Sequence, residues 1–253
     1  MPLAFFSQIK ILTFGSLEST NSLAMKRLKN EEAQNGDIIK AGYQSAGKGQ
    51  AQNTWFSTEG NNLLASIICK NIHLKATELP KLNILVSLAV HSCVNVFLKN
   101  NTTIKWPNDI LVNEKKIAGI LIETMLQGEY IKNAVIGVGL NVNEEVFPDE
   151  LPQACSFFTV TNKYYDLDSL LITLVEQLDI QLSKLKNVDF TDVKEEYERL
   201  LFGLDTKRYF RIAHKTLEGI IKGINATGQL CVEIDNELKT FNNKEIEFYY
   251  SKH

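Results

Sequence analysis

The sequence predicts an α+β fold with two parts, a larger domain of mixed strands and helices over residues 1–203 and a small all-β domain over residues 204–253. Two observations predict this division. Up to residue 202, apolar stretches with the periodicity of strands alternate with longer stretches that have the periodicity of helices. Beyond Gly203 the pattern changes to short strands separated by turns, which is typical of a small β-barrel.

The first half of the chain predicts three strands and two helices. Strands are expected over residues 8–14, 37–43 and 63–69, and helices over residues 22–29 and 79–98. Gly15 is expected to end the first strand. Ser19, Thr20 and Asn21 are preferred N-cap residues and predict the start of the first helix. His91 lies within the apolar stripe of the second helix, so we interpret it as structural.

Residues 104–123 contain the most informative stretch of the sequence. Two short apolar strands, residues 110–112 and 117–122, are joined by a tight polar turn at Asn113–Glu114. Gly119 lies inside the second strand, where glycine usually marks the close approach of a ligand or another backbone. The hairpin is surrounded by three lysines, Lys105, Lys115 and Lys116. Together these features indicate a site for a small anionic ligand.

Residues 44–55 form a loop of small and polar residues that can wrap around a ligand, because its glycines let the backbone approach closely. Lys48 stands between Gly47 and Gly49. The loop nearly matches the phosphate-binding loop of nucleotide hydrolases, but that motif needs Ser or Thr after the lysine, and here Gly49 follows. A P-loop kinase is therefore a weak alternative.

The second half predicts one more buried strand, two helices and the small barrel. The strand is expected over residues 133–142, the helices over 167–185 and 192–202, and the barrel strands over 209–213, 219–224, 230–234 and 239–241. Asn141, at the end of the buried strand, is a candidate ligand contact. Thr191 is expected to cap the last helix and Gly203 to end it.

The charge composition argues against a general nucleic-acid binder. The net charge is −3, whereas such a protein needs a basic face. The charge is unevenly distributed, with nine lysines against four acidic residues between Ile38 and Ile122. This positive middle third favours an anionic small molecule as the ligand.

Cysteine usage and the N-terminal residues predict a cytoplasmic protein. The four cysteines contain no CxxC pair, which excludes a zinc ribbon or a thioredoxin motif and favours buried, reduced thiols. The first ten residues lack a basic leader and a long apolar run, so we expect no signal peptide and no membrane span.

Five motifs in this order and spacing resemble those of the biotin protein ligases, that is, biotin–[carboxyl carrier protein] ligases. The resemblance covers nearly the whole chain. Its motifs are Ser19-Thr20-Asn21, the loop 44–55 that closes on Trp55-Phe56-Ser57, the Lys-Trp-Pro-Asn-Asp run at 105–109, the Lys-Ile-Ala-Gly run at 116–119, and the Ile-Gly-x-Gly-x-Asn run at 136–141.

The resemblance implies a catalytic domain like that of class II aminoacyl-tRNA synthetases, a mixed sheet with flanking helices, followed by an SH3-like barrel. It also implies two half-reactions. The carboxylate of biotin attacks the α-phosphate of MgATP to give biotinyl-5′-AMP and pyrophosphate. A lysine of a biotin carboxyl carrier domain, part of a biotin-dependent carboxylase, then takes the biotinyl group.

The resemblance, together with the chemistry of the side chains, assigns the site residues. Two like-charged groups react, so fixed cations are needed. The expected catalytic residues are Lys116, Lys48 and Asp109, and Asp109 is a candidate either to hold magnesium or to orient the attacking amine. The expected biotin-binding residues are Ser19, Thr20, Asn21, Gln44, Ser45, Gly47, Lys48, Gly49, Gln50, Ala51, Trp55, Lys116 and Gly119. The expected ATP-binding residues are Lys48, Gln50, Trp55, Lys105, Asn108, Asp109 and Asn141.

The chain departs from the family pattern in two ways. The family loop commonly reads Gly-Arg-Gly-Arg-x-Gly, whereas residues 47–52 read Gly-Lys-Gly-Gln-Ala-Gln. Lysine holds phosphate as a point charge and Gln50 carries no charge, so we expect weaker retention of biotinyl-AMP. The Ser-Thr-Asn motif begins at Ser19, which leaves no room for the N-terminal DNA-binding domain of some relatives. We therefore expect a single-function ligase without operator binding.

Two other functions remain as alternatives. A lipoate or octanoyl ligase shares the catalytic architecture, although the Lys-Trp-Pro-Asn-Asp run and the barrel argue against it. A non-catalytic biotin-sensing module is disfavoured by the presence of Lys48, Lys105, Asp109 and Lys116. The sequence leaves open which carboxylase supplies the acceptor, whether the protein is a monomer or a homodimer, and whether residues 48–54 are ordered without ligand.

Overall fold

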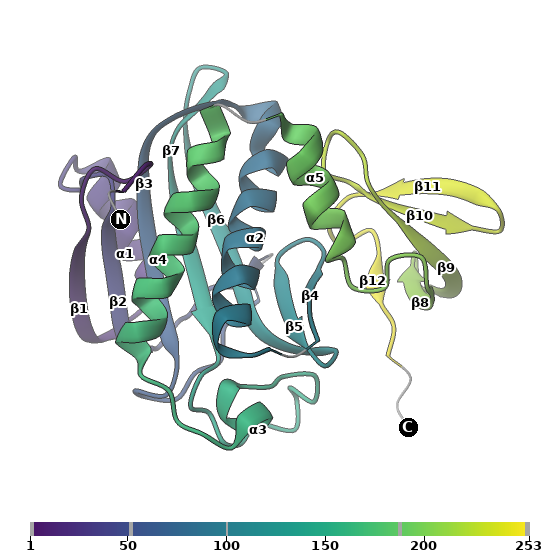
Figure 1. Ribbon diagram of the computed structural model, residues 1–253, viewed down its shortest axis with the longest axis horizontal. Helices are drawn as coiled ribbons and strands as arrows, with labels where there is room; N and C mark the ends of the chain where they lie inside the picture. Colours follow the sequence, from purple (N-terminus) through teal and green to yellow (C-terminus); the bar gives the residue numbers. More distant parts are fainter. Residues whose placement is uncertain (1–2, 51–52, 100, 187–188, 251–253) are drawn as a thin grey trace.

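A mixed seven-stranded sheet forms the centre of the larger part of the molecule (Figure 1). The structure, a computed structural model, describes residues 3–50, 53–99, 101–186 and 189–250. The strand order is β1-β2-β3-β7-β6-β5-β4, in which β1 and β2 are parallel and all other neighbours are antiparallel. The strands are β1 (Lys10–Leu17), β2 (Asp37–Gln44), β3 (Leu63–Lys75), β4 (Thr102–Lys105), β5 (Asp109–Val112), β6 (Lys115–Gln127) and β7 (Tyr130–Leu140).

Helices cover both faces of this sheet. The long helices α2 (Leu79–Phe97) and α4 (Leu167–Ser183) lie side by side over one face, and α1 (Thr20–Lys29) lies behind the sheet in Figure 1. The segment Ala76–Phe97 is long and apolar enough to span a membrane by length and composition. In that segment, however, 61% of the apolar window is buried inside the protein, so α2 is interpreted as a core helix.

The C-terminal part is a second, five-stranded antiparallel sheet with the order β11-β10-β9-β8-β12. Its strands are β8 (Lys207–Ile212), β9 (Lys215–Ile224), β10 (Leu230–Ile234), β11 (Glu237–Phe241) and β12 (Glu247–Phe248). This arrangement of a mixed sheet with helices, followed by a small β domain, confirms the predicted fold class. The boundary at residues 203 and 204 stays a prediction.

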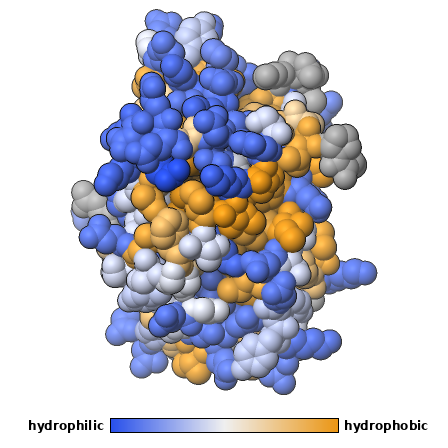
Figure 2. Space-filling view, turned by 90° about the vertical axis from the view of Figure 1, so that its left-hand side faces the viewer, coloured by the Kyte–Doolittle hydropathy of each residue, from blue (hydrophilic) through white to orange (hydrophobic). Residues whose placement is uncertain are grey.

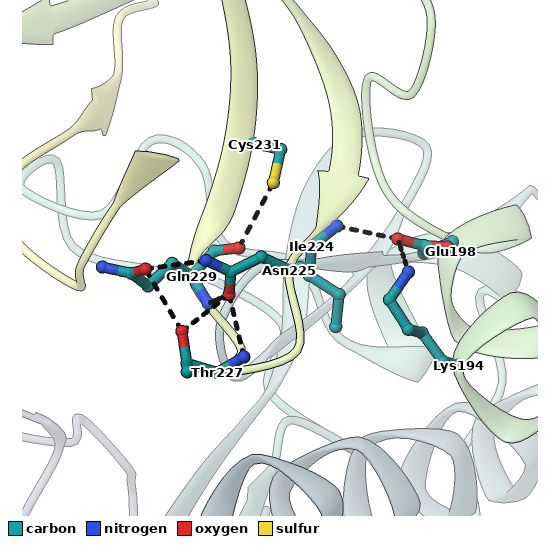
Figure 3. Close-up of polar contacts among 7 residues, drawn as sticks. All are labelled: Lys194, Glu198, Ile224, Asn225, Thr227, Gln229 and Cys231. Carbon is teal, nitrogen blue, oxygen red and sulfur yellow. Dashed lines mark hydrogen bonds and ion pairs between the residues drawn. The ribbon is translucent and has the colours of Figure 1, made fainter. Parts of the chain in front are cut away.

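Helix α5 (Phe190–Arg199) joins the two parts. Figure 3 shows Glu198 of α5 between the ammonium of Lys194 and the backbone of β9. Lys194 Nζ and the backbone N–H of Ile224 both donate to Glu198 Oε1, each at 2.8 Å. Gly223 has φ +124°, and a Cβ there would lie 2.2 Å from the same oxygen, so this close approach requires glycine. The small sheet is therefore hydrogen-bonded to the end of α5.

The predicted hairpin at residues 110–122 is present as β5 and β6. Asn113 and Glu114 have φ values of 49° and 66°, the left-handed backbone that a two-residue hairpin turn requires. Ser19 caps α1 as expected, because its side chain accepts the N–H of Ser22. These two local predictions, the turn and the cap, are confirmed.

Other boundaries differ from the predictions. Gly15 does not end β1, because parallel pairing with β2 continues to Leu17. The cap of α5 is Asp189 rather than Thr191, since the carboxylate of Asp189 accepts the N–H of Thr191, and the helix ends at Arg199. The sequence analysis also did not predict β4, β12 and the short helices α3 (Phe157–Thr161), η2 (Ala76–Glu78) and η3 (Lys184–Lys186).

Candidate active site

A cavity of about 600 Å³ opens on the face of the central sheet that α1 partly covers. Its volume is within the range of small-molecule sites. The predicted site residues that line it are Ser19, Thr20, Asn21, Gln44, Lys48, Gly49, Gln50, Trp55, Lys105, Asn108, Asp109, Lys116 and Gly119. The cavity thus brings together residues from α1, the loop after β2, the β5–β6 hairpin and the segment before it.

Three glycines of β6 and β7 form the bottom of the cavity and are called the glycine floor: Gly119, Gly137 and Gly139. Gly119 and Gly139 are paired across the two strands. A Cβ on Gly139 would lie 2.4 Å from the Trp55 ring, and one on Gly137 would lie 2.2 Å from Asn21 Oδ1. Any side chain here would displace Trp55 or the start of α1, so glycine is required for this close packing.

A buried polar network holds the start of α1. The backbone N–H and the hydroxyl of Thr20 donate to Gln44 Oε1 at 2.7 and 3.0 Å. Ser66 Oγ lies 2.7 Å from Thr20 Oγ1 and donates to Asn21 Oδ1 at 2.6 Å, while Asn21 Nδ2 donates to Glu123 Oε2 at 2.9 Å. These contacts fix several donors and acceptors at one end of the cavity, where a neutral polar ring could bind.

The opposite wall carries an ion pair. Lys116 Nζ lies 2.7 Å from Asp109 Oδ1, and about a third of the Lys116 side chain is exposed. Asp109 Oδ1 is buried and has no directed hydrogen bond among the described residues, so its contact with Lys116 is an ion pair. Lys116 Nζ also lies 5.3 Å from the centre of the Trp55 ring. The indole N–H of Trp55 is buried without a hydrogen-bond partner in the described part of the chain.

Lys105 is the second cation of this wall. Residues Lys105 and Asp109 face each other in the pairing of β4 with β5. Burial lowers the pKa of Lys105 below its ordinary value. The negative charges of Asp109 and Glu247 raise this pKa, and the positive charge of Lys116 lowers it further. Two ammonium groups therefore point toward the same cavity, which suits a ligand with several negative charges.

The glycine-rich loop is folded as a small antiparallel turn over the cavity. Lys48 is bridged to Thr54, and the N–H of Gly49 donates to Asn53 O at 2.7 Å. Gln50 Oε1 accepts a hydrogen bond from Asn243 Nδ2 of the small sheet at 2.7 Å. The side chain of Lys48 is exposed, so its ammonium can reach an incoming anion.

Three of the predicted site residues that the structure describes do not line the cavity. Asn141 is buried, and its side-chain amide donates to Cys155 O at 3.0 Å. Ser45 is exposed outside the cavity. Gly47 packs under Trp55, and its carbonyl oxygen accepts the backbone N–H of Trp55 at 2.9 Å. Ala51 lies outside the described residues. The roles assigned to these residues stay predictions.

The sequence analysis missed the contribution of the small sheet. Five residues around β12 line the cavity: Asn243, Lys244, Ile246, Glu247 and Phe248. They lie more than a hundred residues away from the hairpin in sequence, and no motif marks them. The network residues Ser66 and Glu123 were also missed, because they occur singly in apolar strands.

Two family models match the chain. The biotin/lipoate A/B protein ligase family matches residues 14–141, and the C-terminal domain of biotin protein ligases matches residues 210–249. The first model covers enzymes for both biotin and lipoate, whereas the second is specific to biotin protein ligases.

Similar proteins and structures agree with these matches. The bifunctional ligase/repressor BirA of Bacillus subtilis is 32% identical over 91% of this chain and 71% of its own length. The biotin–[acetyl-CoA-carboxylase] ligase of Mycobacterium tuberculosis is 26% identical over 85% of this chain and 80% of its own. The biotin protein ligase of Aquifex aeolicus, solved in complex with biotin and ATP, superposes with a TM-score of 0.78 at 24% identity, covering 96% of this chain and 99% of that one. This last similarity establishes the fold.

Proposed function

The chain belongs to the biotin/lipoate A/B protein ligase family and is a ligase whose activity is ATP-dependent ligation of biotin, and we propose that this reaction takes place in the cavity above the glycine floor. The observation that carries this assignment is the convergence of Lys116, Lys105 and Asp109 on a cavity whose other end is lined by the polar network of Thr20 and Gln44. One end suits reacting anions and the other suits the neutral ureido ring of biotin.

In the first half-reaction, an oxygen of the biotin carboxylate attacks the α-phosphate of ATP and pyrophosphate leaves. Both reactants are anionic, so cations in fixed positions lower the barrier most. Lys116 holds the biotin carboxylate and the α-phosphate, and Lys105 lies on the side of the remaining phosphates. Lys48, on the exposed loop, closes over the product, biotinyl-5′-AMP.

Magnesium enters with ATP as part of the substrate. Asp109 and Glu247 are the carboxylates among the described residues that line the cavity. The described residues contain no group of three His, Cys, Asp or Glu side chains arranged to hold a metal. This fits an ion held mainly by phosphate oxygens and water, with Asp109 as the protein carboxylate closest to the reacting groups.

In the second half-reaction, the amine of an acceptor lysine attacks the acyl carbon of the adenylate, a proton leaves the amine and AMP departs. The acceptor is a lysine of a biotin carboxyl carrier domain. Asp109 is the group that orients this amine, because it is the carboxylate beside Lys116 in the lining of the cavity. In the form without substrate, the same carboxylate positions Lys116.

The location and assembly of the protein follow from its surface and thiols. We propose a cytoplasmic location, which the four buried cysteines without disulfide bonds support. Figure 2 views the side of the molecule on which β1 lies, and hydrophobic residues gather in its middle. β1 is an edge strand, and its Ile11 is 44% exposed. Such an edge can pair with a second copy, so a homodimer is the proposed assembly; light scattering on the purified protein, with and without biotin and ATP, tests it.

Incubation with biotin, MgATP and a purified biotin carboxyl carrier domain tests the assigned activity, with lipoate as the matched control. We expect pyrophosphate release that requires biotin, and attachment of the biotinyl group to one lysine of the carrier. Preferential transfer of lipoate would instead establish the lipoate or octanoyl ligase alternative. Binding of biotin without any pyrophosphate release would establish a sensing module.

A further inference from the structure

The ammonium of Lys105 lies between two aromatic rings of the C-terminal segment. Its Nζ is 5.1 Å from the centre of the Phe248 ring and 5.3 Å from the centre of the Tyr250 ring. Lys105 ends β4 in the central sheet, whereas Phe248 ends β12 in the small sheet. The central sheet therefore carries this ammonium group, whereas the rings that contact it belong to the C-terminal segment.

Lys105 contacts two aromatic rings, whereas the neighbouring Lys116 contacts a carboxylate. Lys116 is paired with the carboxylate of Asp109, whereas no ion pair joins Lys105 to a carboxylate among the described residues. The charges of Asp109 and Glu247 act on Lys105 only from further away. Phe248 is itself anchored, with its ring 5.2 Å from that of Phe210 and 5.5 Å from that of Phe202. One side of the Lys105 site is therefore part of the core of the small sheet.

An aromatic pair has a chemical advantage over a carboxylate at this place. The ring faces stabilise an ammonium group through their quadrupole without adding a negative charge. A carboxylate would repel the phosphates of a nucleotide, whereas the rings leave the positive charge available. Tyr250 is uncharged at neutral pH, as a tyrosine ordinarily is, and burial raises the pKa of its hydroxyl further, to about 12.

We propose that Phe248 and Tyr250 are positioning residues that hold the Lys105 ammonium toward the nucleotide phosphates. This inference rests on the proposed function and deepens it, because it makes the C-terminal segment part of the ATP site. The family matches end at residue 249 and assign no role to this aromatic pair. The substrate affected is ATP rather than biotin, since the polar network proposed for the ureido ring is formed by Thr20 and Gln44 and does not include Lys105.

Three variants test the proposal through biotin-dependent pyrophosphate exchange. Tyr250→Leu keeps an apolar side chain but removes the ring, and we expect the KM for ATP to rise about two- to tenfold with the KM for biotin unchanged. Tyr250→Phe keeps the ring and should behave like the wild type. Tyr249→Leu is the matched control, because Tyr249 contacts Arg211 rather than Lys105 and its loss should leave both KM values unchanged.

The proposal is overturned if Tyr250→Leu leaves the KM for ATP unchanged, or if Tyr250→Phe is impaired as much as Tyr250→Leu. A second measurement, made on the wild type, does not depend on activity. Nuclear magnetic resonance of the Lys105 side chain, assigned with Lys105→Arg, should show its ε-methylene protons shifted upfield of the other lysines by the two rings. Signals at the ordinary lysine position would equally overturn the proposal. Absence of biotin-dependent exchange in the wild type would instead contradict the proposed function, so the two failures are distinguishable.

Discussion

At the scale of single residues, the account depends on the state of Lys116. Its ammonium is held by Asp109 at 2.7 Å and by the face of Trp55, so it is oriented before substrate arrives. An oriented cation needs little reorganisation when charge develops on the α-phosphate, which is where fixed charges contribute most to catalysis.

Replacing Lys116 with Gln tests this role. We expect biotin-dependent pyrophosphate exchange to fall about 10²- to 10³-fold, because the charge that stabilises the reacting phosphate is removed. Lys115→Gln is the control, since Lys115 is the exposed neighbour on the same strand and does not line the cavity. If the two variants have the same activity, Lys116 does not contact the reacting groups.

Gln50 stands in the loop where relatives commonly carry arginine, and we expect this difference to weaken the retention of the adenylate. Gln50→Arg introduces a guanidinium that can bind phosphate with two hydrogen bonds, so we expect release of biotinyl-5′-AMP to slow about tenfold. Gln50→Met removes the hydrogen bond to Asn243 without adding charge. It therefore separates the effect of losing this hydrogen bond from the effect of adding a positive charge. The measurement is the off-rate of labelled adenylate, and equal rates for wild type and Gln50→Arg would eliminate this explanation.

At the scale of elements, β6 and β7 shape the bottom of the cavity, because the glycine floor carries no side chains. The missing Cβ atoms let Asn21 and Trp55 lie directly on the sheet. The paired strands are buried at these positions, so the floor has a fixed shape. A floor of fixed shape beneath a loop that can close is a suitable arrangement for sequestering a reactive adenylate.

Gly137→Ala tests the floor. Its Cβ would meet Asn21 Oδ1 at 2.2 Å, so the start of α1 must move. We expect a rise of about tenfold in the KM for biotin and a loss of about 1–3 kcal/mol in stability. Gly15→Ala is the matched control in a strand with no atom within 4 Å of the added Cβ, and it should be neutral. Equal biotin KM values for both variants would show that biotin does not bind above the floor.

His91 couples α2 to β4 and makes stability depend on pH. Its Nε2–H donates to Thr102 O at 3.2 Å, and burial lowers its pKa below the ordinary 6.5. The folded state therefore keeps His91 neutral where the unfolded chain is protonated. The contribution of His91 to the free energy of unfolding is fully present above about pH 6.5, the pKa in the unfolded chain. It is lost progressively as the pH falls from there through the lowered pKa of the folded state.

His91→Gln removes this proton linkage, because glutamine does not titrate but keeps an N–H donor. We expect the difference in melting temperature between pH 7.5 and pH 5.5 to be smaller in His91→Gln than in the wild type. The check is thermal unfolding followed by circular dichroism at both pH values. The same pH dependence in both proteins would assign the acid sensitivity to other groups.

At the scale of the whole molecule, the cavity is completed by both sheets. Trp106, within the Lys-Trp-Pro-Asn-Asp run, donates its indole N–H to Gly228 O of the small sheet at 2.9 Å. On the other side, Glu198 holds the backbone of Ile224 (Figure 3). These contacts, together with the hydrogen bond from Asn243 to Gln50, hold the small sheet against the rest of the molecule, and its residues around β12 line the cavity.

The fold class and the residues of the central sheet that line the cavity could be predicted from the sequence, because they depend on local signals. The Asn113–Glu114 turn and the Ser19 cap are formed by neighbours in the chain. Gly15 was misread because pairing with β2, a long-range contact, continues the strand beyond it. The residues around β12 could not be predicted for the same reason: their place in the cavity depends on how two separate sheets pack together.

A crystal structure with biotin and ATP tests the central claim most directly. The account predicts the ureido ring against Thr20 and Gln44, and the carboxyl group, or the adenylate formed from it, within hydrogen-bonding distance of Lys116 Nζ. Biotin bound outside this cavity, with the Lys116 ammonium directed into solvent, would contradict it.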